Sequence, residues 1–162
     1  MDISELKQEL LQGKLRPFYV FTGDELALQD VYIDKIQKLS GMQMIRAESL
    51  GAIYTKLTAK SLIKTSPCLY VIRNDEVYHK AETSWDKFIK AKSLKDNIVI
   101  MLYSGVEKSS KFVKHHDEVC TQFDYIGESI LRNRLQATTG MPIQYCDDIV
   151  KLCGCNYGRI KN

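Results

Sequence analysis

Apolar residues recur along residues 1–126 in short continuous runs that alternate with amphipathic stretches. Each run is bounded by turn residues and is continuously apolar, which predicts a strand buried on both faces. The predicted strands are Pro17–Phe21, Met42–Ala47, Cys68–Ile72, Ile98–Tyr103 and Val119–Ile126. Because helices are predicted between them, we expect an α/β fold: a Rossmann-like, mostly parallel sheet with helices on both faces.

The amphipathic stretches follow the helical period of 3.6 residues. Asp2 to Glu5 has the pattern of a capping box, so the first helix is expected to start there and to stop at Gly13. Further helices are predicted over residues 24–40, 51–63, 83–92 and 109–118. The inward face of the helix over residues 24–40 is expected to be Leu28, Val31, Tyr32, Ile36 and Leu39. Along the last strand, Val119, Thr121, Phe123 and Tyr125 are expected to share one face.

The pattern changes after Ile126, where strands stop and only helices are predicted. Two helices are expected over residues 128–139 and 142–152, with Pro142 at the first helical position. Another element is expected to begin at Tyr157. We therefore expect an α/β domain over residues 1–126 and an incomplete helical subdomain over residues 127–162.

Composition narrows the class of protein. Of 162 residues, 44% are hydrophobic and 27% are charged, which excludes a disordered tail and a collagen. No apolar run reaches membrane-spanning length, and the acidic N-terminus does not have the pattern of a signal peptide. We expect a cytoplasmic protein with no membrane partner. The net charge of +3 does not by itself indicate nucleic-acid binding.

Cysteine and histidine positions do not form a recognisable metal site. The five cysteines are an odd number, which argues against a disulfide framework. Cys68 and Cys120 lie in apolar stretches and are expected to be buried. Cys153 and Cys155 are one close pair, whereas a zinc site normally needs four ligands. The pair His115 and His116 is expected on a helix surface. We predict no metal and no catalytic residue.

The loop after the first strand lies where open parallel sheets bind phosphate. A P-loop would have the pattern G-x-x-x-x-G-K-[ST] there. Counting from Gly23, the positions of the second glycine, the lysine and the hydroxyl residue hold Leu28, Gln29 and Asp30. The phosphate-neutralising cation is missing and nearby carboxylates would repel phosphates. We predict a degenerate loop that binds no nucleotide, and no cofactor.

A second acidic pair, Asp75 and Glu76, follows the strand Cys68–Ile72. A Walker-B strand ends in an acidic residue that holds magnesium. Because Arg73 and Asn74 intervene here, the expected setting of the acids is a solvated loop.

Three segments resemble the delta subunit of bacterial DNA polymerase III. Gly13–Glu25 is similar to the family's helix end, apolar strand and G-[DN]-[ED] turn. Val71–Asn74 resembles its third strand with a terminal asparagine, and Leu152–Ile160 resembles a motif of its helical subdomain. Each motif is weak alone, and it is their order and spacing that carry the resemblance.

The resemblance implies a degenerate AAA+ module with a Rossmann-like domain, a helical lid and a collar domain. The family's delta subunit does not hydrolyse ATP and is not an enzyme by itself. It belongs to a DNA-directed DNA polymerase holoenzyme, where it binds the sliding clamp, the beta subunit, and opens one interface of the ring. The implied partners in DNA replication are that clamp and the loader subunits delta prime and gamma/tau. Primed DNA is bound only within the complex.

The family's clamp contact is a helix end before the third strand, with a Q-x-x-S-L-F-like pattern. Residues 58–63 occupy that place here. Ser61 and Leu62 agree with the pattern, Ile63 replaces the aromatic residue and Thr58 replaces the glutamine. The resemblance implies a clamp contact at these four residues. The alternative, that Leu62 and Ile63 are core residues, stays open.

Two other functions stay open from the residues themselves. One is a nucleotide-binding α/β enzyme of the P-loop or Rossmann kind, which the degenerate loop disfavours. The other is an α/β protein-interaction domain unrelated to replication.

The family's collar domain is not reached before Asn162, so we expect either a fragment or a reduced relative such as a phage protein.

Overall fold

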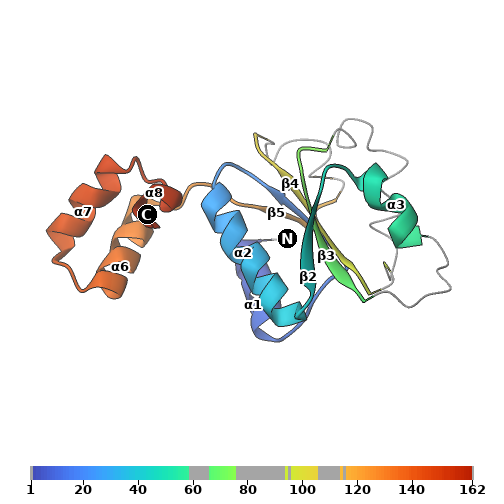
Figure 1. The fold of residues 1–162 in the computed structure, drawn as a ribbon. Helices are drawn as coiled ribbons and strands as arrows, with labels where there is room; N and C mark the ends of the chain where they lie inside the picture. Colours follow the sequence, from blue (N-terminus) through green and yellow to red (C-terminus); the bar gives the residue numbers. More distant parts are fainter. Residues whose placement is uncertain are drawn as a thin grey trace.

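The computed structural model describes residues 2–58, 66–75, 94, 96–105, 114 and 116–161. A five-stranded sheet has the order β2-β3-β4-β1-β5, and every pairing in it is parallel (Figure 1). The strands are β1 (Phe18–Thr22), β2 (Gln43–Ala47), β3 (Cys68–Arg73), β4 (Ile98–Tyr103) and β5 (Cys120–Gln122). The helices are α1 (Ile3–Leu11), α2 (Leu26–Ser40), α3 (Leu50–Thr58), α6 (Glu128–Thr139), α7 (Ile143–Leu152) and α8 (Tyr157–Lys161). The predicted parallel α/β fold is confirmed.

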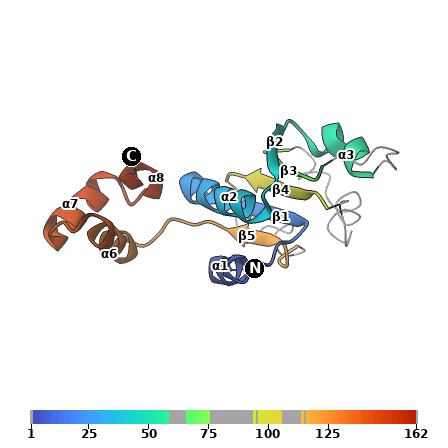
Figure 2. The same ribbon diagram turned by 60° about the horizontal axis from the view of Figure 1, so that its bottom comes forward.

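The sheet is buried on both faces because its central strands are continuously apolar. All residues of β1 and β4 are buried, and the two strands pair in register from Phe18 opposite Val99 to Thr22 opposite Tyr103. Helices α1 and α2 cover one face of the sheet and α3 lies on the other (Figures 1 and 2).

The core on the α1 and α2 side is the more aromatic of the two. Phe21 lies edge-on to Phe123 with ring centroids 4.8 Å apart, and Tyr32 from α2 meets the same Phe123 ring at 5.4 Å. Leu6 of α1 closes this core and is fully buried. The predicted capping box at the start of α1 is present, with the Asp2 N–H donating to the Glu5 carboxylate at 3.0 Å.

The core on the α3 side joins β1, β3 and β4 to one helix. Ile53 and Leu57 of α3 are buried there against strand residues such as Val20 and Ile72. The predicted helix over residues 51–63 is therefore confirmed as far as Thr58, and its remainder lies outside the described residues. The predicted helix over 83–92 and most of that over 109–118 also lie outside them.

The inward face of α2 agrees with the prediction at Leu28, Tyr32 and Ile36 and differs from it in three apolar residues. Ile33 is buried beside Tyr32 and Ile36, whereas Val31 is half-buried and Leu39 is 42% exposed. The buried stripe runs through positions 28, 29, 32, 33 and 36, at the spacing of three and four that one helix face requires. Leu39 instead lines a hollow between α1 and α2.

The last strand is shorter than predicted. Only Cys120–Gln122 forms β5, because its partner β1 ends at Thr22, opposite Gln122. Val119 packs in the α3-side core and Phe123 in the opposite one, so the four predicted residues do not share a face. Tyr125 lies past the strand and is 58% exposed.

His116, just before β5, and Cys68, at the start of β3, also differ from the prediction in their burial. His116 is buried and not on the surface. Its backbone carbonyl accepts the N–H groups of Val119 and Cys120, in the turn that leads into β5. Cys120 is buried as expected, but Cys68 is only half-buried at the start of β3.

Helices α6, α7 and α8 form a separate cluster beyond the N-terminal end of α2 (Figures 1 and 2). In this cluster, the described side chains that are buried are Leu131, Cys146 and Val150. Pro142 is the N-cap of α7 and not its first helical residue, since its ψ of 141° is outside the helical range. None of the described helices combines the length and the apolar character needed to cross a membrane.

Candidate functional site: a degenerate nucleotide loop

The loop between β1 and α2 lies at the carboxyl end of the central parallel strands, where such sheets bind ligands. Its first residue, Gly23, has a φ of +96°. A Cβ atom at this position would lie 2.4 Å from the carbonyl oxygen of Phe123. Glycine is therefore required by the close passage of the chain that leaves β5, and not by a phosphate group.

Gln29 occupies the position of the P-loop lysine and is fully buried. Its amide nitrogen donates to the carbonyl oxygens of Thr22, at 3.3 Å, and Gly23, at 3.0 Å. This neutral side chain is thus bound to the loop's own carbonyl groups. A lysine with an ammonium free for a phosphate would need a different arrangement of the loop.

The other two positions of the motif also lack phosphate-binding chemistry. Leu28, at the second glycine position, is buried in the core on the α1 and α2 side. Asp30, at the hydroxyl position, is exposed and pairs with Arg73 at the end of β3, with 2.8 Å between Nη2 and Oδ1. The structure therefore places Gly23 directly after β1 and Leu28, Gln29 and Asp30 at the start of α2, and none of these residues has a cationic or hydroxyl side chain.

Glu25 is the residue that the sequence analysis missed in this loop. From the sequence, its carboxylate is expected to open the helix that follows and to repel phosphates, both at the surface, yet the side chain is 1% exposed. The Oε2 atom accepts the backbone N–H of Tyr157, the first residue of α8, at 3.2 Å. Its own backbone N–H donates to the Phe123 carbonyl at 3.1 Å. Glu25 thus links the loop to both β5 and α8.

Helix α8 lies directly against the start of α2. Gly158 approaches Ala27 so closely that a Cβ atom on the glycine would lie 2.9 Å from the Ala27 Cβ. Tyr157 is half-buried against the core on the α1 and α2 side. The Arg134 guanidinium of α6 lies 4.8 Å from the centre of the Tyr157 ring. We name the contacts of Glu25, Ala27, Arg134, Tyr157 and Gly158 the α8 contact.

Asp75 corrects a second expectation. It is not solvated but buried, and its Oδ2 accepts the backbone N–H of Leu50, the first residue of α3. A carboxylate at this place stabilises the positive N-terminal end of the helix. Asn74 precedes it with a φ of +50°, and its N–H donates to the Leu102 carbonyl at 2.8 Å. The end of β3 is therefore tied to α3 and β4. Glu76 lies outside the described residues.

The predicted clamp contact is placed only in part. Thr58 is the last residue of α3, while Ser61, Leu62 and Ile63 lie outside the described residues. Since Ile53 and Leu57 are both buried, the side of α3 that faces the sheet is known.

The described residues contain no group of three or more histidine, cysteine or acidic side chains that could hold a metal ion. Cys153 and Cys155 are half-buried, and the Cys155 thiol lies 3.5 Å from a Glu128 carboxylate oxygen. His115 lies outside the described residues.

Comparison with protein-family models and with curated proteins finds no match. Among solved structures, the chain is similar to the Bacillus subtilis DNA clamp loader delta protein, with a TM-score of 0.62 and 12% identity. It is also similar to two variants of Thermotoga maritima RuvB, with TM-scores of 0.51 and 0.50 at 11% and 12% identity. These alignments cover 96–97% of this chain.

The structural likeness shows the fold: this chain has an AAA+-like α/β fold. At these identities it shows nothing further about activity. The chain spans about half the length of these structures, 54% of the clamp loader protein and 55% of RuvB.

Proposed function

We propose that the protein is a non-catalytic clamp-loader subunit that binds and opens a sliding clamp during DNA replication. Two observations together carry this proposal, the similarity of the fold and the contacts made at the loop after β1. The fold is similar to the Bacillus subtilis clamp loader delta protein over 97% of this chain. At the loop that would bind a nucleotide, the buried side chains of Gln29 and Glu25 form hydrogen bonds with backbone groups of the protein itself.

The degenerate loop supports a role without nucleotide chemistry. The variant RuvB structures share the fold, so the fold alone does not separate an ATPase from a non-catalytic subunit. The residues at the loop favour the non-catalytic subunit. Phosphate binding needs a cation and backbone N–H groups directed at the ligand, and the hydroxyl group that follows the P-loop lysine is a ligand of the magnesium ion. Here Gln29 and Asp30 replace the lysine and the hydroxyl residue, and the N–H of Glu25 is bound to Phe123.

The proposed clamp contact consists of Leu62 and Ile63, with Ser61 and Thr58 beside them. Burial of Ile53 and Leu57 sets the side of α3 that faces the core. If the helical period continued beyond Thr58, Leu62 and Ile63 would lie about 140° and 120° away from Leu57 around the axis. Leu62 would then be directed away from the core, and Ile63, about 80° from Ile53, would lie at the border of the buried face, so that Leu62 above all would be available to an apolar pocket on a partner.

The remaining partners are proposed in the same sense. The subunits delta prime and gamma/tau would assemble with this chain, and primed DNA would be bound only by the assembly.

We also propose a domain boundary near Ile126, between the α/β domain and the helical subdomain. The break between β5 and α6 at residues 123–127 supports it.

Binding to the purified sliding clamp tests the proposal directly. Surface plasmon resonance with immobilised clamp should give saturable binding, and Leu62→Ala with Ile63→Ala should abolish it without unfolding the protein. The matched control is Ile130→Ala with Ile143→Ala, which removes two exposed aliphatic side chains from α6 and α7 and should leave binding unchanged.

Two results would contradict the proposal. One is a folded wild-type protein that does not bind the clamp. The other is saturable binding of ATP in a calorimetric titration, with a micromolar dissociation constant. That result would favour the nucleotide-binding enzyme. If the double variant stays folded and still binds, the contact lies elsewhere on the chain.

A further inference from the structure

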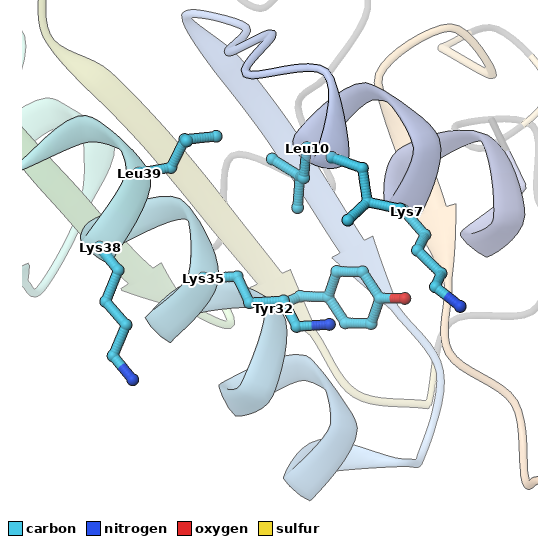
Figure 3. A pocket seen from close by; sticks show the side chains of 7 residues that line it. Lys7, Leu10, Tyr32, Lys35, Lys38 and Leu39 are labelled. Atoms are coloured by element: carbon cyan, nitrogen blue, oxygen red, sulfur yellow. The ribbon is translucent and has the colours of Figure 1, made fainter.

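A hollow of about 400 Å³ lies between α1 and α2 and is lined mainly by apolar atoms. Leu10 and Leu11 come from α1, and Tyr32 and Leu39 come from α2 (Figure 3). A volume of this size is within the range of sites that bury the apolar part of a ligand.

Two leucine side chains at this hollow are exposed. Leu11 is 77% exposed and Leu39 is 42% exposed. The buried stripe of α2 ends at Ile36, so Leu39 has no role in the core beneath that helix. Two large aliphatic side chains at one opening form an apolar surface that a partner could cover.

The charges around the hollow have one sign. Among the described residues that line it, every charged one is a lysine: Lys7 on α1 and Lys35 and Lys38 on α2. All three are exposed, and Lys7 and Lys38 extend from opposite sides of the opening (Figure 3). An apolar floor with a basic rim is complementary to an apolar side chain flanked by carboxylates.

We propose that this lysine-rimmed hollow is a docking site for an acidic amphipathic helix of another protein. Leucine-like side chains on one face of that helix would enter between Leu10, Leu11 and Leu39. Glutamate or aspartate side chains at its borders would pair with Lys7, Lys35 and Lys38. A helix fits this chemistry because its apolar residues recur on one face while its charged residues flank them.

Nucleic acid fits the hollow less well, although its phosphates would also be attracted by lysines. A nucleic-acid groove normally offers an aromatic face on which a base stacks. The Tyr32 ring is covered by the Lys35 ammonium, which lies 4.7 Å from the ring centre. Phosphates would also leave the leucines exposed.

The site is independent of the proposed clamp contact. Helices α1 and α2 cover one face of the sheet, and α3, which leads to the clamp contact, covers the other. A protein that binds no clamp at all could still use the hollow.

The test uses a fluorescein-labelled peptide of about 18 residues, in which leucines recur at i, i+3, i+4 and i+7 and glutamates fill most other positions. Fluorescence anisotropy with the full chain should show saturable binding with a dissociation constant on the order of 10–100 μM. Raising the salt from 50 to 500 mM should weaken binding roughly tenfold, because exposed ion pairs are screened.

Protein variants locate the site. Lys7→Glu with Lys35→Glu and Lys38→Glu should weaken binding by about tenfold or more. Lys56→Glu, at an exposed position of α3 on the opposite face of the sheet, is the control and should leave binding unchanged. Leu11→Ser should also weaken binding, and the protein should stay folded because this side chain is mostly exposed. Circular dichroism checks the fold of each variant.

Several results would overturn the proposal. Equal affinity of the peptide for the triple lysine variant would place the contact elsewhere. Equal binding of a peptide with lysines in place of its glutamates would remove the charge argument. Binding of duplex DNA, lost in the triple variant, without peptide binding would identify a phosphate surface instead. Concentration-dependent dimerisation that Leu11→Ser abolishes would assign the hollow to a second copy of this chain.

Discussion

The α/β part and the α6–α8 cluster are stabilised by different interactions. In the α/β part, continuous apolar strands are buried between two cores, one under α1 and α2 and one under α3. In the α6–α8 cluster, Leu131, Cys146 and Val150 are the buried side chains among the described residues. The cluster meets the α/β part mainly through the α8 contact. The first part therefore provides the stability of the fold, and a few short-range contacts set the position of the second.

The same comparison explains the degenerate loop. A nucleotide-binding loop must leave its N–H groups free for a ligand. Here the loop is used for internal contacts: Gly23 for the passage of the chain at Phe123, and Glu25 for the seat of α8. The polar residues of this loop therefore connect two parts of the chain.

Phe21→Ala should produce the largest effect, because Phe21 is fully buried and touches Phe123 edge-on. Removing a buried aromatic ring typically costs about 3–5 kcal/mol of unfolding free energy. Urea denaturation followed by circular dichroism measures it. Tyr125→Ala removes an aromatic ring that is mostly exposed, and should change the unfolding free energy by less than about 0.5 kcal/mol. Equal effects of the two substitutions would show that the apolar core does not dominate stability.

The strands were predictable because their signal is local. β1 and β4 are apolar at every position, so neither their existence nor their burial depends on knowing a partner. The end of β5 was not predictable in this way. Tyr125 continues the alternating pattern in the sequence, but the partner strand ends at Thr22, and only the pairing reveals it.

The degenerate loop was predicted from the missing lysine, but its internal contacts were not. The buried Glu25 carboxylate accepts the N–H of Tyr157, which is 132 residues later in the sequence. Asp75 is buried by the N-terminus of α3, which begins 25 residues before it. An acidic residue has the same sequence signal in a solvated loop and at a helix end, so only the tertiary arrangement separates the two. The predicted clamp residues Ser61, Leu62 and Ile63 stay a prediction.

Gly158→Ala should disturb the α8 contact while leaving the α/β core intact. The added Cβ would lie 2.9 Å from the Ala27 Cβ, which has no freedom to rotate away, so α8 must shift. Overpacking of this kind costs about 1–3 kcal/mol locally. Hydrogen exchange should show faster exchange of the Tyr157 N–H, with unchanged protection in β1 and β4.

Gly127→Ala is the matched control for that substitution. Gly127 has a φ of −60° and no atom within 4 Å of its added Cβ, so alanine fits there. Its exchange pattern should equal that of the wild type. If Gly158→Ala has the same pattern as Gly127→Ala, α8 is not seated on α2 in solution.

Two substitutions of Glu25 should produce a smaller effect and separate its charge from its hydrogen bond. Glu25→Ala removes the acceptor of the Tyr157 N–H and should speed exchange of that amide roughly tenfold, as expected for a hydrogen bond worth about 1 kcal/mol. Glu25→Gln keeps a side-chain oxygen that accepts the same N–H and should retain most of the protection. Loss of protection in both variants would mean that the charge, and not the hydrogen bond, holds α8.

The smallest effect is expected from a polar pair inside the α/β part. Arg16 donates to the Glu9 carboxylate of α1 through both Nε and Nη2, and its Nη1 donates to the Glu118 carbonyl. The hydrogen bond from Arg16 lowers the pKa of Glu9 below its ordinary value of 4.5. The pair therefore stabilises the fold fully above that value, and this stabilisation is lost as pH falls through the lower pKa of the folded state.

Unfolding free energies measured between pH 7 and pH 3 should show this loss as a shallow decline that begins below about pH 4.5. Glu9→Gln should reduce the decline, and the difference from the wild type at pH 7 should stay at or below about 1 kcal/mol, because both side chains are partly exposed to solvent. Glu5→Gln is the control. Glu5 is an exposed carboxylate on the same helix that accepts the N–H of Asp2, so its substitution affects helix capping but not the link from α1 through Arg16 to Glu118. A Glu9→Gln variant with the full wild-type decline would show that other carboxylates account for the acid sensitivity. A loss well above 1 kcal/mol at pH 7 would show that polar contacts contribute as much to the α/β part as they do to the α8 contact.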